Sequence, residues 1–237
     1  PVGWPSHDVD HDEAAAAIRT ACERIDIIAK ETNTQIHLAI EPEPGCIIGS
    51  AAEFARFVDE HKLNDLGQRG LLRACLDACH LAVMHESPAG AIEILAESDI
   101  AIGRIQLSSA PEAHHEHFDD LIALAEPRWL HQTSIHHHDS FTLVRDLSEA
   151  PTTHQAGVWR AHLHVPIHLD RIGSLHTTRG TIVELLASAA TLNYRPSVEV
   201  ETYAWSVLPA AIRKPTLGED VAAELSWATQ TLREVGW

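Results

Sequence analysis

Apolar positions follow two spacings along this chain, and the spacing changes from one segment to the next. Between residues 11 and 32 they recur every three or four positions, which predicts an amphipathic helix that Asp12 and Glu13 open. The same spacing predicts further helices over residues 51–61, 88–98, 116–126, 140–150, 177–192 and 217–236. Short apolar runs that end at proline, glycine or polar residues predict strands over residues 36–41, 70–83, 100–110, 159–169 and 196–205.

The alternation of these elements predicts an α/β fold. Strands that alternate with helices usually pair in parallel and are joined by helical crossovers. The predicted strands end in polar residues, as in TIM (β/α)8 barrels, whose active sites lie at the carboxyl ends of the strands. A complete barrel needs about 250 residues, and too few βα units fit here. We therefore expect one α/β barrel domain over residues 1–237 that lacks its first three βα units, with a helical, histidine-rich insert at about 111–158. An open doubly wound sheet is the alternative.

Composition narrows the possible partners. The formal net charge of −17 repels phosphate backbones, which argues against nucleic acid and favours a small-molecule substrate or a metal. No apolar stretch reaches the roughly 18–20 residues that span a bilayer, and no secretory signal is visible. The four cysteines therefore suggest reduced thiols in a cytoplasmic protein. A homo-oligomer is possible.

Three carboxylates stand where predicted strands end. Because side chains two apart on a strand share a face, Glu41, Asp77 and Glu201 would converge at the top of a closed barrel. Carboxylates at close range cannot all stay ionised without a cation, so we expect a divalent metal there. Oxygen-rich ligation joined by an imidazole and an amide suits Mn, Mg or Co, and Zn or Fe are also possible.

Neutral side chains on the same predicted faces complete this site. Gln106 and His164 are the expected further metal ligands, and His162, two residues before His164, is an expected substrate-binding residue. His80, three residues after Asp77, would orient the substrate or bind a metal. The structural alternatives are that Asp77 caps a helix and that Gln106 and the two histidines form a polar layer inside the barrel.

Two charged residues are candidates for binding the substrate. Glu43 follows Glu41 on the same face, at the rim of the predicted site. Arg104 precedes Gln106 by two residues, and its alternative role is an ion pair with a glutamate.

Several motifs resemble one barrel superfamily. The segments LAIEPEP, CLDACH and VEVET resemble the fourth, fifth and eighth strands of the xylose-isomerase-like barrels, which include sugar epimerases and endonuclease IV. Within that superfamily the segments AIEPEPGC, CLDACHLAV, IQLSSA, LHQT and HVP are most similar to the EboE, or metabolite traffic protein, family.

The resemblance implies roles for matching residues. Glu41 and Asp77 would ligate a metal, Glu201 would be a ligand and often a base, and His80 would bind a metal or the substrate. Two positions depart from the superfamily: Gln106 replaces the histidine or aspartate of the sixth strand, and His162-Leu-His164 replaces the Asp-x-His of the endonucleases.

Three functional hypotheses follow from these residues. The first is a metal-dependent enzyme, in which the metal polarises a polyol-like substrate and Glu201 or Glu41 moves a proton during isomerisation or epimerisation, with metal-dependent hydrolysis as a near variant. The second is a small-molecule binding or traffic protein that kept the pocket without catalysis, which the neutral Gln106 motivates. The third treats the histidine-rich segment 131–139 as an interaction or metal-delivery loop.

Overall fold

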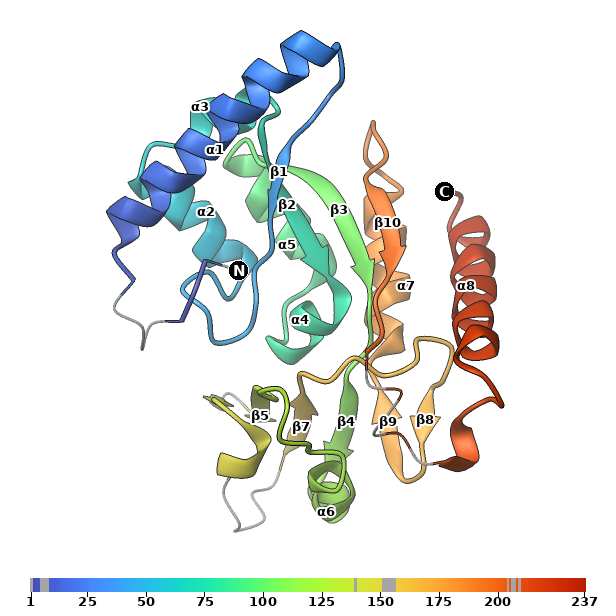
Figure 1. The fold of residues 1–237 in the computed structure, drawn as a ribbon. Helices are drawn as coiled ribbons and strands as arrows, with labels where there is room; N and C mark the ends of the chain where they lie inside the picture. Colours follow the sequence, from blue (N-terminus) through green and yellow to red (C-terminus); the bar gives the residue numbers. More distant parts are fainter. Residues whose placement is uncertain are drawn as a thin grey trace.

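Two β-sheets of different kinds make up the framework of the chain (Figure 1). The computed structural model describes residues 2–4, 9–138, 140–150, 157–203, 205, 208 and 210–237. The first sheet is parallel, in the order β1 (Leu38–Ile40), β2 (Leu72–Asp77), β3 (Ala101–Leu107) and β10 (Ser197–Val200). The second is antiparallel, in the order β6 (Ser140–Val144), β5 (Thr133–His137), β7 (Val158–Ala161), β4 (Pro111–His114), β9 (Leu175–Thr177) and β8 (Arg171–Ile172).

The helices begin where the sequence supplies capping groups. Asp10 caps the first helix, Ser50 the second and Ser87 the fifth, and Thr216 forms a capping box with Glu219 at the last. The α-helices are α1 (His11–Thr32), α2 (Ala51–Glu60), α3 (Asn64–Gln68), α4 (Ala78–Val83), α5 (Pro88–Glu97), α6 (Phe118–Ile122), α7 (Arg179–Ala189) and α8 (Leu217–Glu234). Single turns of 3₁₀-helix lie at η2 (His115–His117), η3 (Leu147–Glu149) and η5 (Ala210–Ile212).

Only one face of the parallel sheet packs against the main core. Leu72, Ala74 and Leu76 of β2 point into the apolar cluster that α1, α2, α5 and α7 also line. The alternating residues Arg73, Cys75 and Asp77 do not belong to this cluster, because successive side chains of a strand point to opposite faces. The polar face of the sheet thus carries the chemically active side chains.

The antiparallel sheet has a core of its own. Trp159 of β7 is fully buried, and its ring packs on Phe118 with the ring centroids 4.3 Å apart. The chain passes directly from β3 of the first sheet into β4 of the second, and the two sheets lie one above the other in Figure 1. The residues near this junction are those that form the candidate site.

The predicted TIM barrel is wrong. In the predicted barrel, the segment that contains His162 and His164 would form a parallel strand. This strand would lie between the strand that contains Gln106 and the strand that contains Glu199. The structure instead pairs β3 directly with β10, with Gln106 opposite Glu199. It places β7 between β5 and β4 of the antiparallel sheet. The physical reason is that Trp159 is buried in the second core, and that residues 162–164, although alternating in polarity, join no sheet.

Three local predictions also fail. The predicted helical insert at 111–158 contains the strands β4, β5 and β6 beside the short helix α6. Residues 140–144 form β6 rather than a helix, and their β-branched and aromatic side chains suit its pairing with β5. The apolar run after Asp77 is the helix α4 and not more strand. The histidine-rich segment 131–139 is largely β5 rather than a loop, and residue 139 lies outside the described residues.

None of the described helices combines the length and the hydrophobicity that are required to span a membrane.

A pair of isoleucine substitutions tests this core. Ile105 on β3 is fully buried, so Ile105→Ala should lower the free energy of unfolding by about 2–5 kcal/mol through lost burial and the cavity that remains. Ile27 on α1 is 48% exposed, and Ile27→Ala should change that free energy by less than about 1 kcal/mol. Urea unfolding followed by circular dichroism measures both, and similar values for the two variants would contradict this packing.

Candidate metal centre

Asp77 connects the end of β2 to the start of α4. Its Oδ1 accepts a hydrogen bond from the backbone N–H of His80 at 2.8 Å, which caps the helix. Its Oδ2 accepts a hydrogen bond from the hydroxyl of Ser108 at 2.6 Å, and that hydroxyl accepts from the backbone N–H of Cys79. Asp77 is 1% exposed, so these bonds hold its carboxylate rigidly beneath the histidines.

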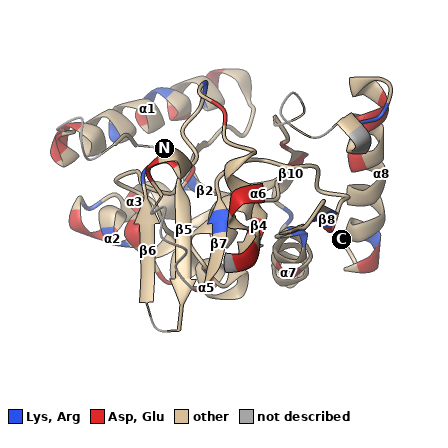
Figure 2. Cartoon of the chain, turned by 90° about the horizontal axis from the view of Figure 1, so that it is seen from below, with Lys and Arg blue, Asp and Glu red and all other residues tan. Residues whose placement is uncertain are grey.

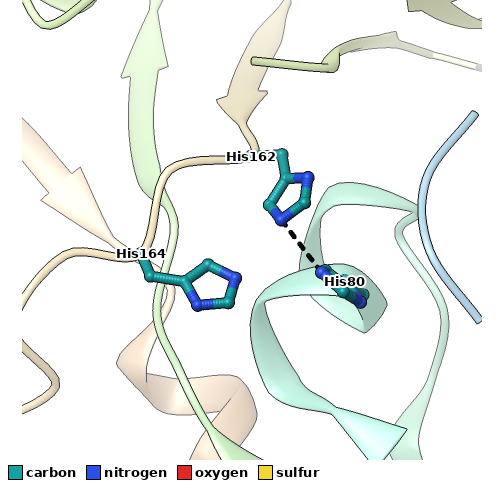
Figure 3. Close-up of side chains that lie close together, drawn as sticks. All are labelled: His80, His162 and His164. Atoms are coloured by element: carbon teal, nitrogen blue, oxygen red, sulfur yellow. Dashed lines mark hydrogen bonds between the residues drawn. The ribbon is translucent and has the colours of Figure 1, made fainter. Parts of the chain in front are cut away.

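Two buried imidazoles meet through their Nε2 atoms. Nδ1 of His80 lies 3.0 Å from the carbonyl oxygen of Pro42, which can only accept, so this nitrogen carries the proton and Nε2 keeps its lone pair. Nδ1 of His162 lies 2.8 Å from Oε1 of Gln132, and donation there leaves the lone pair of that ring on Nε2 also. The two Nε2 atoms are 2.9 Å apart (Figure 3). In this arrangement two lone pairs face each other, and a metal ion bound to both rings would remove their repulsion.

The Gln132 amide controls the contact between the two rings. If its nitrogen faced His162, that ring would donate from Nε2 to His80, and the pair would be an ordinary hydrogen bond. Because a hydrogen bond and a metal both satisfy this contact, it does not by itself require a metal.

His164 supplies the independent observation. Its side chain is 2% exposed, and neither Nδ1 nor Nε2 has a hydrogen-bond partner among the described residues. Its Nε2 lies 4.0 Å from Oδ1 of Asp77, and its Nδ1 lies 3.9 Å from Oε1 of Glu201. These distances are too long for hydrogen bonds, whereas metal bonds of about 2.0–2.2 Å let two ligand atoms lie up to ~4 Å apart. A buried imidazole without a partner in an otherwise bonded cluster fits a metal ligand.

Among the described residues, three overlapping groups of side chains could hold a metal ion. Each brings its ligand atoms within 4.8 Å of one another. One group contains His80, His162 and His164, which point toward a common region in Figure 3. The others are Asp77 with Cys79 and His164, and Glu41 with Asp77 and His80. Because the groups share members, they describe one centre with alternative ligand sets.

Burial sets the protonation of the centre. It lowers the pKa of both His80 and His162 well below the ordinary value, with neighbouring imidazoles adding to the effect, so both rings are neutral and able to bind a metal. Burial, followed by the charges of Asp77 and Glu201, raises the pKa of Glu41 to about 8. Burial also raises the pKa of Glu201. The positive charges around Glu41 and Glu201 therefore do not offset the effects of burial and of the neighbouring carboxylates on their pKa values.

A cavity of about 450 Å³ lies above the centre. Its acidic lining consists of Glu41, Glu43 and Glu201, and His80, His162 and His164 face it as well. Aromatic walls come from Trp4, Trp129 and Tyr203, with the rings of the last two 5.0 Å apart. The cavity has the size and mixed lining of a small-molecule site.

The structure brings together most of the residues that the sequence singled out. Gln106 differs in its contacts: its amide nitrogen donates to Glu201, and its amide oxygen accepts from the thiol of Cys75 at 2.9 Å. Its amide oxygen is therefore already engaged, and Gln106 positions Glu201. Nη1 of Arg104 donates to both carboxylate oxygens of Glu199 at 2.9 Å, and Arg104 does not line the cavity.

The sequence predictions missed other parts of the site. Cys79, Gln132 and Trp129 were not proposed, and neither were Trp4 and Tyr203. Gln132 lies within the LHQT motif, which was the one available signal for it. Trp129 and Tyr203 come from segments without regular structure, so no periodicity marks them.

Comparison of the chain with protein-family models, with curated proteins and with solved structures found no match.

The charge balance predicts that metal binding depends on pH. Below about pH 8 the metal must displace the proton of Glu41, so the affinity for Co²⁺ should fall as the pH falls from 8 to 6, by up to about tenfold per unit. Glu41→Gln should flatten this dependence. The matched control is Glu43→Gln, a cavity residue outside the three ligand groups, which should keep it. Calorimetric titration measures the affinities, and the same pH slope in both variants would exclude Glu41.

Proposed function

We propose that this chain binds one divalent metal through its histidine cluster and acts on a small polar metabolite as a metal-dependent isomerase or epimerase. The observation that carries the proposal is the buried His164, whose two nitrogens lack partners beside two further imidazoles and Asp77. The cavity above them supplies room for a substrate.

The donor set narrows the choice of metal. Imidazoles together with carboxylates suit Zn²⁺, Fe²⁺, Co²⁺ or Mn²⁺, whereas Mg²⁺ favours oxygen ligands. His80 and His162 each direct Nδ1 to a carbonyl oxygen, which is the usual outer partner of a metal-bound imidazole. When bound, such a metal polarises a carbonyl or hydroxyl of the substrate.

Two carboxylates flank the centre on the cavity wall. Glu41 follows β1 and Glu201 follows β10, so they reach the cavity from opposite edges of the parallel sheet. A base that removes a proton and a second group that returns one are what isomerisation and epimerisation require. Gln106 holds Glu201 in place by donating to its carboxylate.

The resemblance to the EboE family is compatible with this proposal but rests on short motifs. It suggests a small metabolite as the ligand and does not specify a reaction. The proposed metal site and the two carboxylates beside it favour catalysis over the binding or traffic alternative.

Loss of one imidazole should remove the metal. His164→Ala should reduce bound Zn²⁺ from about one per chain to nearly zero, because a centre of three or four protein ligands loses one of them. His11→Ala is the matched control, since His11 is exposed at the start of α1 and belongs to none of the ligand groups. Elemental analysis after dialysis gives both contents, and full retention of zinc by His164→Ala would contradict the centre.

A second substitution separates metal binding from proton transfer. Glu201→Gln should keep the metal but reduce deuterium uptake from D₂O into the substrate by about 100-fold or more, the usual worth of a general base. Glu199→Gln, two residues earlier and outside the cavity, should leave exchange unchanged. Proton NMR of metal-loaded protein with a panel of aldoses, ketoses and polyols detects the exchange.

The same experiment distinguishes the alternatives. Ligand binding without any exchange in the native protein would favour a non-catalytic binding protein. Exchange that survives in Glu201→Gln would assign the base to another residue.

A further inference from the structure

A second cavity lies at the opposite end of the parallel strands. It has a volume of about 370 Å³ and is formed by the last turns of α1, the segment that follows α1, and the start of β2. Arg73 and His37 line it, four residues before Asp77 and Glu41 respectively. Four strand residues span about 13 Å, so this cavity is separate from the metal centre.

Arg73 stands out among the arginines of the chain. Of those that are partly shielded from solvent, Arg19, Arg160 and Arg179 each lie within 4.0 Å of a carboxylate. Arg73 has no such partner within the described residues, and its Nε is buried without a hydrogen bond. In a chain with a net charge of −17, carboxylates are abundant, so an unpaired and half-buried guanidinium leaves an anion site open.

The neighbouring backbone is shaped around this arginine. Gly103 of β3 lies beside it, and a Cβ there would come 3.0 Å from Cβ of Arg73 and 2.7 Å from Nε2 of His37. Only glycine at position 103 lets both side chains lie over the sheet without displacement. His37 therefore lies beside Arg73 in the lining of the same cavity and offers a second hydrogen-bonding group to a ligand there.

The rest of the lining is cationic or neutral apart from one carboxylate. Lys30 and Arg69 line the cavity and share the single acidic residue, Asp26, at 2.8 Å and 2.7 Å. Asn33, Thr34 and Gln35 add uncharged hydrogen-bonding groups. Elsewhere acidic residues are interspersed with basic ones along α1 and α8 (Figure 2). The cavity therefore differs from the surrounding surface in carrying an uncompensated positive charge.

We infer that this cavity is a binding site for a small oxyanion, a phosphate or a carboxylate group, which pairs with the guanidinium of Arg73 and is contacted by His37. A guanidinium presents two parallel N–H donors that match either group. The site is independent of the metal centre and would take an effector, or the charged group of a ligand held at this end of the sheet.

Titration of metal-free protein with inorganic phosphate tests the inference. At pH 7 and constant ionic strength, calorimetry should show saturable binding, and Arg73→Gln should weaken the affinity at least about tenfold. Arg24→Gln is the matched control, because Arg24 is exposed on the same helix as Lys30 and does not line the cavity. Citrate, titrated in parallel, shows whether the site prefers a carboxylate.

A second measurement does not depend on the variant being stable. In the ¹H–¹⁵N spectrum of the native protein, phosphate or citrate should shift the amide resonances of Gly70 and Leu71 and leave those near His80 unmoved. Arg73→Lys should retain weakened binding, because it keeps the charge but loses the planar fork. Absence of binding by both anions, equal affinity in Arg73→Gln, or shifts confined to the histidine cluster would overturn the inference.

Discussion

The candidate centre depends on the hydrogen bonds that the carboxylate of Asp77 accepts. Asp77 ends β2, caps α4 and accepts a hydrogen bond from Ser108 at the end of the neighbouring strand β3. These contacts fix the direction in which α4 leaves the sheet and so place His80 three residues later. The ring of His80 then meets His162, which comes from the segment after β7. The contact between His80 and His162 thus links the two sheets, and the carboxylate of Asp77 beside it favours a cation among neutral imidazoles.

The polar face of the parallel sheet explains where the chemistry lies. Parallel sheets are usually apolar on both faces, but within the described residues the main apolar core lies against only one face of this sheet. The other face carries a line of polar side chains from Arg73 to Asp77 on β2, with Arg104 and Gln106 beside them on β3. The two ends of this line differ in charge. At the amino end the guanidinium of Arg73 has no carboxylate partner among the described residues, and the carboxyl end has clustered carboxylates and imidazoles. A cation and an anion are therefore expected at different ends of the same strands.

Local signals in the sequence predicted much of the site. Glu41, Asp77 and Glu201 were identified because each closes an apolar run, and the structure places each at or just beyond the end of a parallel strand. The path of the chain between β3 and β10 could not be predicted in this way. Whether residues 158–161 pair with β3 or with β5 depends on distant partners, and the alternation of polar and apolar residues is the same in either sheet. Similarly, the apolar run after Asp77 fits a strand or a short buried helix equally well, and the capping bond of Asp77 decides the matter.

The proposed centre consists of one metal held by three imidazoles. X-ray absorption of the zinc-loaded protein is the decisive measurement, because it reports the ligand atoms themselves. We expect nitrogen and oxygen ligands at about 2.0–2.1 Å, with outer scattering from about three imidazole rings and no sulfur. A sulfur ligand at about 2.3 Å would assign the metal to the group that contains Cys79, and a first shell without imidazole would contradict the centre described here.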